Sequence, residues 1–334
     1  MIVGAGLAGA CAAAALAPTH AVTVWDDGRP GATGAAAGLA NPFAGQSARR
    51  AWRADEALAA LHALDGLGAT RWTGLLRPAA SAKQARRFRR RAGEHAALDW
   101  LDADAVAERA PGLVAPLGAL DVREAGVVDL DALRRALLDR ARALGAEVRY
   151  ETWTPDAITD YSATLLCAGA ALARLAPGLA LGAIKGQTIT LRGAPLATPP
   201  VAGRTYLVPR ADGTVVVGAT FERDFAHPRP TDEATALLHA RAAALVPALA
   251  GAEVVGARAG VRVTVPTTVS PHRLPVLGPI SATPVPATAG SRLWAFGALG
   301  SRGLLTAPLL ASWLPAALGD ADALPPEIRP RRAT

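Results

Sequence analysis

The chain has 334 residues, 51% of them apolar and 19% charged, and a formal net charge of +7 at pH 7. This length suits two domains or one large α/β unit, and no apolar run is long enough to cross a bilayer. Six scattered histidines lack metal-ligand spacing and both cysteines stand in apolar settings, which predicts no metal site and no disulfide.

A glycine-rich turn opens the chain. Gly4, Gly6 and Gly9 form the pattern GxGxxG between an apolar strand stub and a small-residue helix over 7–17. In a dinucleotide-binding turn the first glycine permits the tight turn. The second lets the backbone approach a pyrophosphate, and the third lets the helix pack close to the sheet. A second strand ends at Asp26, where a carboxylate accepts hydrogen bonds from the adenosine ribose. The sequence therefore predicts a dinucleotide-binding fold.

The same segment has one competing interpretation, a secretory signal. Such signals begin with basic residues, and no Lys or Arg precedes Arg29. The stretch is also broken by glycines, Pro18 and His20. We interpret it as structural and the protein as cytoplasmic. The first strand is so short that we expect a few further residues upstream.

Three segments of different composition follow. Residues 28–45 form a Gly- and Ala-rich loop with neither helical nor strand period, which we expect to cover a flat cofactor. A helix is expected over 49–68. The run 83–91 holds one lysine and five arginines and predicts a helix. Its charged side is either a solvated face or a patch for a nucleic-acid backbone.

Aspartate N-caps are expected to begin the next two helices, at Asp102 or Asp104 and at Asp129 or Asp131. A strand over 147–152 follows. Residues 163–175 are typical of a buried strand that runs into Gly169 and a new helix. This is a second place where the backbone could approach a cofactor.

From residue 184 the pattern changes to alternating strands. The expected elements are a strand over 184–191, a hairpin over 205–222 turning at Asp212 and Gly213, a helix over 231–245 and a strand over 254–264. The C-terminal part returns to an α/β pattern, with a strand over 293–296, a Gly-Ser-Arg-Gly turn, a helix over 303–318 and a loose tail from Pro325 to Thr334.

This order predicts an α/β fold with an α+β insert: a Rossmann-like FAD-binding domain with a β-rich substrate domain. A nicotinamide dehydrogenase would not need the closing glycine turn. A flavoprotein would need it, because a second backbone site far along the chain must hold the flavin ring. We expect a discontinuous FAD-binding domain over 1–75, 126–183 and 276–334, and a substrate domain over 76–125 and 184–275.

These motifs together resemble the FAD-dependent D-amino-acid oxidase family. The ordered segments are GAGLAG, GATGAAAGLANPF, LLCAGA, IKGQ, YLVPRADGTVVVGAT, AGVRVTVPTTVSPHRLPVLG and FGALGSRGLLTAPLLA. Within the family the chain is similar to glycine oxidases. Its C-terminal part is most similar to the FAD domain of the bifunctional proteins that make tRNA 5-methylaminomethyl-2-thiouridine.

The resemblance implies a set of cofactor-binding positions. The adenosine diphosphate part would lie on Gly4, Gly6, Gly9 and Asp26. The flavin and its ribityl chain would lie along Gly38, Leu39, Asn41 and Gly169, and its ring edge against Gly300, Ser301, Arg302, Gly303 and Leu304. Sarcosine oxidases attach flavin to a cysteine in the closing turn. None stands there, so we expect non-covalent FAD.

The resemblance also implies the substrate residues. Arg262 stands where glycine oxidase binds the substrate carboxylate, Tyr206 where a tyrosine lines the same site, and Phe221 where an apolar side chain covers the substrate. A guanidinium holds a carboxylate through two parallel bonds. Structural roles stay open: Arg262 could form a salt bridge and Tyr206 could be half-buried core. The segment after Arg262 is longer than in glycine oxidase, so the site geometry there can differ.

The function expected is oxidation of the C–N bond of a glycine-like amine by hydride transfer to flavin N5, with hydrolysis of the imine. The substrate is a free small amino acid or the carboxymethylaminomethyl group of a tRNA wobble uridine. An alternative is a non-catalytic or electron-relay flavoprotein subunit that needs a partner chain. Neither a membrane partner nor a particular oligomeric state is predicted.

Overall fold

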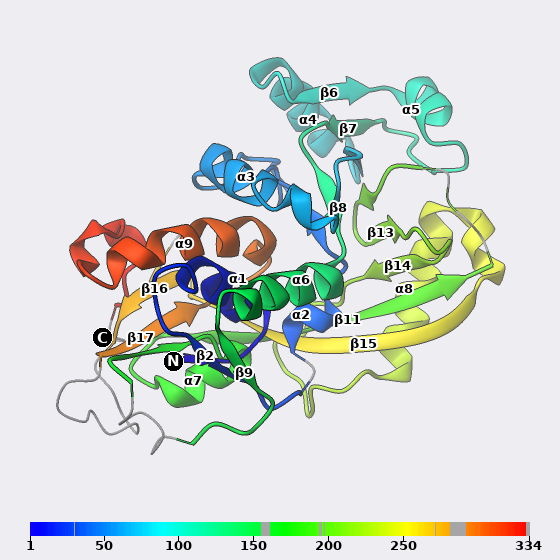
Figure 1. The fold of residues 1–334 in the computed structure, drawn as a ribbon. Helices are drawn as coiled ribbons and strands as arrows, with labels where there is room; N and C mark the ends of the chain where they lie inside the picture. Colours follow the sequence, from blue (N-terminus) through cyan, green and yellow to red (C-terminus); the bar gives the residue numbers. More distant parts are fainter. Residues whose placement is uncertain are drawn as a thin grey trace.

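The computed structural model describes residues 1–29, 31–154, 161–193, 196, 198–270, 272–280 and 292–331. Its strands form two large sheets and one small one. One large sheet holds strands from both ends of the chain, and the other extends from it toward the opposite side of the molecule (Figure 1).

The first large sheet has six strands in the order β16-β17-β10-β1-β2-β9. They are β1 (Ile2–Val3), β2 (Thr23–Trp25), β9 (Glu147–Arg149), β10 (Ala163–Leu166), β16 (Val276–Pro279) and β17 (Arg292–Gly297). All neighbours are parallel except β16 and β17. The short first strand is thus central, because β10 and β2 flank it. This is the predicted α/β half.

Helices cover this sheet, as a parallel sheet requires. They are α1 (Leu7–Leu16), α3 (Ala54–His62), α6 (Leu130–Ala143), the short α7 (Leu172–Leu175) and α9 (Gly303–Ala317). The small side chains of α1 are buried along most of its length, because α6 and α9 both pack against it. The Asp129 carboxylate caps α6, accepting from the amide of Ala132.

The second large sheet has eight strands in the order β15-β11-β14-β13-β12-β5-β7-β6. They are β5 (Leu75–Pro78), β6 (Leu98–Leu101), β7 (Ala119–Val122), β11 (Gly182–Arg192), β12 (Val201–Ala202), β13 (Tyr206–Pro209), β14 (Val215–Gly218) and β15 (Glu253–Thr264). Only the β12–β5 pair is parallel. The helices of this part are α4 (Ala82–Glu94), α5 (Ala103–Arg109) and α8 (Asp232–Leu245).

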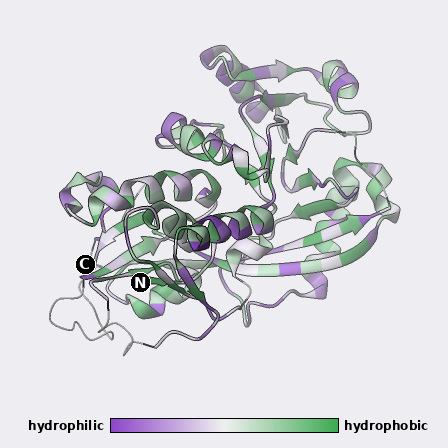
Figure 2. Ribbon diagram, viewed as in Figure 1, coloured by the Kyte–Doolittle hydropathy of each residue, from purple (hydrophilic) through white to green (hydrophobic). Residues whose placement is uncertain are grey.

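The division of strands between the two large sheets follows the chain closely. Strands between 75 and 122 and between 182 and 264 form the larger sheet, and the remaining long strands form the other. Hydrophobic residues follow the strands of both, whereas hydrophilic residues gather on α4 and α6 (Figure 2). The predicted domain boundaries lie near these changes of sheet; the division into domains itself stays a prediction.

The loop expected over 28–45 contains two short elements that the sequence did not indicate. They are α2 (Ala32–Ala35) and β3 (Leu39–Ala40), and β3 joins β8 (Gly126–Val128) and β4 (Thr70–Arg71) in a three-stranded sheet. Distant contacts hold them, because the Thr188 hydroxyl donates to the carbonyl of Ala35 at 3.0 Å. Local periodicity could not predict such short elements.

Two other expectations differ in detail. The helix expected over 49–68 is limited to α3, followed by a 3-10 turn at Asp65–Leu67, because Arg53 takes a left-handed conformation with φ of 46°. The C-terminal segment includes a 3-10 turn at Pro326–Ile328 with a buried Ile328, so it is anchored rather than loose up to residue 331. Residues 332–334 lie outside the described residues. Further 3-10 turns are Gly169–Ala171, Pro247–Gly251 and Ala321–Ala323.

Across the part of the chain that the structure describes, none of the helices has the length and apolar character needed to cross a bilayer.

Candidate functional site

A large cavity lies between the two large sheets. Its volume is about 2400 Å³, and residues from both ends of the chain line it. Pockets for drug-sized ligands have volumes of about 300 to 1,000 Å³. The cavity therefore has room for a dinucleotide and a second, smaller molecule.

The opening glycine turn forms one end of this cavity. Gly4 has a φ of +100°, and a Cβ on Gly9 would lie 1.8 Å from the Gly4 carbonyl oxygen. The turn and α1 therefore touch directly, as a dinucleotide-binding turn requires. Gly6 precedes α1, and no side chain of its own caps that helix. The Leu7 amide donates to the Thr33 hydroxyl, and the other N–H groups of the first turn of α1 suit an anion.

Asp26 lies where the sequence placed it, directly after β2 and on the cavity wall. Its two carboxylate oxygens accept from the backbone amides of Ala5 at 2.6 Å and Gly28 at 2.9 Å. The carboxylate thus fixes the glycine turn as well as facing the cavity. Its lone pairs exceed these two bonds, so it can accept further hydrogen bonds.

The predicted flavin-side positions line the same cavity: Gly38, Leu39, Asn41, Gly169, Gly300, Ser301, Arg302, Gly303 and Leu304. Gly38 has a φ of +74°, and a Cβ there would lie 1.9 Å from the carbonyl oxygen of Val128. A Cβ on Gly169 would meet no atom within 4 Å, so that glycine leaves open space in the cavity. The backbone here is shaped for a flat group.

The closing turn is attached directly to β15. The amide of Gly300 donates to the carbonyl of Val263 at 3.1 Å, and α9 begins at Gly303 without a side-chain cap. The Arg302 guanidinium donates to the carbonyl of His272 at 3.3 Å, and burial, with a smaller effect of Arg273, lowers its pKa. A second helix N-terminus therefore lines the cavity, at the same sheet edge as that of α1, because α1 and α9 follow parallel strands.

Arg262 and Tyr206 face the middle of the cavity. Within the described residues Arg262 has no carboxylate partner, and burial lowers its pKa, an effect that Tyr206 partly offsets. Burial raises the pKa of Tyr206 to about 12, although the Arg262 charge opposes the rise. A half-buried cation without a counter-ion and a neutral phenol form a receptor for an anionic group.

The structure places Phe221 differently from the other predicted residues. It is absent from the cavity lining, its side chain is exposed, and the Arg262 guanidinium lies 5.4 Å from its ring centroid. Arg223 lies 5.6 Å from the same centroid. Phe221 is thus positioned to support Arg262, while Phe225 lines the cavity. Its role as an apolar cover over the substrate stays a prediction.

Sequence reasoning missed two lining residues that shape the cavity. The hydroxyl of Thr33 accepts from the amide of Leu7 at 3.1 Å, so α2 contacts the first turn of α1. The buried Arg77 donates to the carbonyls of Phe43 and Gly45 and holds their loop at the wall. Both contacts join residues far apart in sequence, and no local signal could have shown them.

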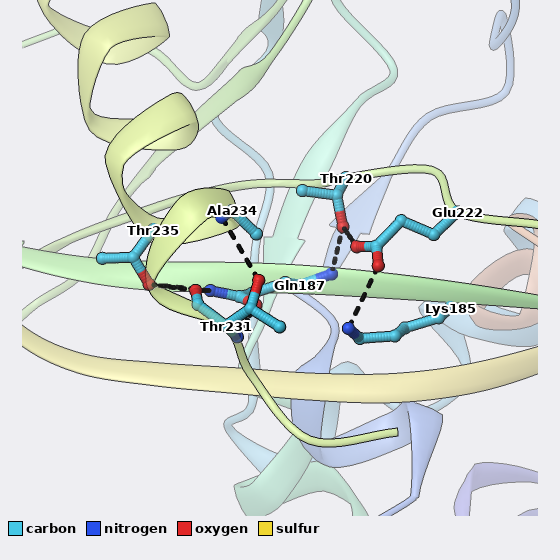
Figure 3. A network of polar contacts seen from close by, with 7 residues as sticks. All are labelled: Lys185, Gln187, Thr220, Glu222, Thr231, Ala234 and Thr235. Carbon is cyan, nitrogen blue, oxygen red and sulfur yellow. Dashed lines mark hydrogen bonds and ion pairs between the residues drawn. The ribbon is translucent and has the colours of Figure 1, made fainter. Parts of the chain in front are cut away.

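A polar network joins β11 to the segment after β14 and to the start of α8 (Figure 3). Lys185 is 2% exposed and its ammonium lies 3.0 Å from the Glu222 carboxylate, which also accepts from the Thr220 hydroxyl at 2.6 Å. Gln187 continues the network, because its side-chain amide exchanges hydrogen bonds with the backbone of Thr231 at the start of α8. The network fixes the segment after β14, whose first residue, Ala219, lines the cavity.

Comparison with known proteins identifies the fold and the cofactor. The family described as FAD dependent oxidoreductase matches residues 1–316. A tRNA 5-methylaminomethyl-2-thiouridine biosynthesis bifunctional protein from Maricaulis maris is 33% identical over 323 residues, which cover 93% of this chain and 50% of that protein. The chain thus spans about half the length of this relative.

Two solved structures are similar over nearly their whole length. The glycine oxidase of Geobacillus kaustophilus has a TM-score of 0.79 and 26% identity, and the match covers 96% of this chain and 94% of that one. The iminodiacetate oxidase of Chelativorans sp. BNC1 has a TM-score of 0.80 and 26% identity, with 98% of each chain covered.

Proposed function

The chain belongs to the family of FAD dependent oxidoreductases, and from this premise we propose that it oxidises the C–N bond of a glycine-like amine. The observation that carries the proposal is Arg262, a half-buried cation without a carboxylate partner among the described residues, in the cavity that the glycine turns also line. Such a group suits the carboxylate of an amino acid.

The cavity fits FAD. The first helix terminus and Asp26 suit the adenosine diphosphate part, and Gly169, whose Cβ position has no atom within 4 Å, leaves space for the flavin. Bound FAD supplies a two-electron acceptor for the hydride of the carbon next to the substrate nitrogen. We propose non-covalent binding, because both cysteines, Cys11 and Cys167, are buried and burial raises the pKa of each thiol.

The side chains of this chain then orient and desolvate the substrate. Arg262 would bind the carboxylate through two parallel charge-assisted hydrogen bonds, and the exposed ring of Phe221 would hold its guanidinium from the other side. Tyr206 would donate a third bond from a phenol that stays protonated at neutral pH. The ammonium of the amino acid loses its proton to solvent, the carbon gives up a hydride, and water hydrolyses the imine to a carbonyl compound and an amine.

Two substrates share this chemistry. One is a free small amino acid, and its support is the similarity to glycine oxidase over nearly the whole chain. The other is the carboxymethylaminomethyl group of a tRNA wobble uridine, an N-substituted glycine, and its support is the tRNA-modifying relative. The Arg262 site would serve either one.

The test is anaerobic mixing of the purified yellow protein with glycine, sarcosine, D-amino acids, D-proline and tRNA bearing the modified uridine. We expect loss of flavin absorbance with at least one compound and release of glyoxylate where the substrate is an N-substituted glycine. Arg262→Ala should abolish this loss while keeping FAD bound. Arg192→Ala is the matched control, because Arg192 is an exposed residue at the far end of β11.

If no compound reduces the flavin, the proposed activity is wrong. Bound FAD without reduction, together with a copurifying second chain, would support the alternative of an electron-relay subunit. We further propose that the protein works in the cytoplasm, where two free, buried thiols such as Cys11 and Cys167 are ordinary.

A further inference from the structure

The cavity has a basic rim at the end where a substrate would enter. Lys83 and Arg87 on α4 and Arg204 after β12 line it, and Lys83 and Arg204 are exposed. None of the three forms an ion pair with another described residue. A rim of this kind is a candidate for binding an anion.

Three other arginines of α4 have contacts of their own outside the cavity. Arg89 lies over the ring of Trp100 at 5.0 Å, and Arg90 and Arg91 both pair with Glu94. Lys83 and Arg87, one helical turn apart, line the cavity instead. Among the described residues Arg86 also has no ion pair, but it does not line the cavity, so Lys83 and Arg87 are the unpaired α4 cations of the cavity wall.

The sheet topology brings Arg204 to the same rim. β12 and β5 are parallel neighbours, so the chain leaves both at one edge, toward Arg204 and toward α4 respectively. Ala202 packs in the apolar cluster that contains Phe88 of α4. Arg204 also precedes Tyr206 by two residues, at most about 7 Å of extended chain. Arg204 is thus close in the chain to Tyr206, whose pKa the Arg262 charge lowers against the effect of burial.

No acidic side chain balances this end of the cavity. The carboxylates among its described lining residues are Asp26, Asp27 and Asp131. The first two follow β2 at the nucleotide end, and Asp131 pairs with Arg258 at 3.0 Å. The described lining residues thus give Lys83, Arg87 and Arg204 no carboxylate partner.

We propose that the rim formed by Lys83, Arg87 and Arg204 binds a second anionic group of the substrate, which is then a glycine-like amine with a carboxylate or phosphate a few bonds from its nitrogen. This inference rests on the proposed function of the Arg262 site. A single anion fits better than a nucleic-acid strand, because a strand engages about six to ten cations, whereas this rim offers only Lys83, Arg87 and Arg204.

The test measures binding separately from turnover. Calorimetry on the FAD-loaded protein compares N-carboxyalkyl glycines with one to three methylenes, iminodiacetate being the shortest, with N-alkyl glycines of equal length. For at least one length we expect the dianion to bind about tenfold more tightly at low salt, and the difference to shrink as salt rises. Inorganic phosphate should compete with the dianions, and the kcat/KM values should follow the same order.

Lys83→Ala, Arg87→Ala and Arg204→Ala should each remove most of the dianion preference and leave N-alkyl glycine binding unchanged. Arg86→Ala is the matched control, because Arg86 is an exposed arginine of the same helix outside the cavity lining. Equal affinity for dianions and N-alkyl glycines at every length would overturn the proposal. So would rim variants that weaken both classes alike.

Two outcomes separate this proposal from the others. Dianion binding without flavin reduction would retain the rim site and refute the proposed oxidation. Tight binding of tRNA that Arg86→Ala weakens as much as Arg87→Ala, without any preference among small amines, would replace the rim site with a nucleic-acid surface.

Discussion

The buried pair of Lys185 and Glu222 predicts an asymmetric response to mutation. Lys185 is almost fully buried, whereas the Glu222 side chain is 29% exposed. Replacing Glu222 by Gln leaves an ammonium inside the protein with its main partner gone. Replacing Lys185 by Met leaves a carboxylate that water can still reach and that the Thr220 hydroxyl still binds. The two substitutions break the same contact, but only one strands a buried charge.

The magnitudes follow from this difference. Removing one partner of a buried pair costs about 3 to 5 kcal/mol, and we expect about 3 kcal/mol for Glu222→Gln because its side chain is partly exposed. Lys185→Met keeps a side chain of similar length and should cost about 1 kcal/mol. The double variant should resemble Lys185→Met, so the coupling energy of the pair is about 3 kcal/mol.

The pH dependence gives an independent check. Burial would raise the pKa of Glu222, but the bonds from Thr220 and Lys185 outweigh it and lower the pKa below the unfolded value. The pair therefore stabilises the fold fully above the unfolded carboxyl pKa of about 4.3. Its contribution is lost as the pH falls through the lower folded pKa. The stability gap between wild type and Lys185→Met should shrink over this acid range.

Equilibrium urea unfolding of the FAD-loaded protein, followed by tryptophan fluorescence and circular dichroism, measures these free energies. Lys83→Met is the control, because Lys83 is the other lysine of the chain and is exposed. It should change the stability by less than about 0.5 kcal/mol. A Lys185→Met variant that is as unstable as Glu222→Gln, or a double variant no better than Glu222→Gln, would refute the reasoning.

Three further predictions concern the cavity. Gly9→Ala puts a Cβ 1.8 Å from the Gly4 carbonyl oxygen, so the absorbance of bound flavin near about 450 nm should fall tenfold or more. Gly66→Ala is the control: its Cβ would meet no atom within 4 Å, so this variant should keep its flavin. Equal flavin content in Gly9→Ala and Gly66→Ala would contradict the prediction. Asp26→Asn loses the charged acceptor of a 2.6 Å bond and should weaken FAD binding about tenfold in a fluorescence titration of apoprotein; unchanged affinity would count against the assignment. Tyr206→Phe should lower kcat/KM by about three- to tenfold without altering its pH profile below about pH 10, since burial raises the phenol pKa to about 12; the loss of a basic limb in the variant would show that Tyr206 ionises.

The sequence predicted the cofactor end of the cavity well, for a physical reason. Backbone turns that approach a flat ligand need glycine at fixed spacing, so the requirement is local and readable. The turns at Gly4 and Gly300, almost three hundred residues apart, both line the one cavity. The long alternating strands and the aspartate caps were predictable too, and the structure selects Asp102 and Asp129 from the alternatives left open.

Features that depend on distant contacts could not be predicted. The alternation of IKGQT places Lys185 and Gln187 on one polar face, which favours an exposed surface. That face is instead buried, because α8 covers it and Glu222 lies 37 residues away in sequence. The exposed position of Phe221 has a similar origin, because the cation above its ring comes from β15, a strand 32 residues or more further along.

The direct attachment of the closing turn to β15 has a consequence for motion. The carbonyl next to Arg262 accepts from Gly300, and Thr264 forms a bridge with Leu299, so backbone contacts join this arginine to the start of α9. Hydrogen-bonded backbone of this kind fluctuates on the picosecond-to-nanosecond timescale, whereas opening and closing motions take microseconds to milliseconds. Arg262 and the start of α9 should therefore move together, and relaxation-dispersion signals around Arg262 and Gly300 should report one shared exchange rate.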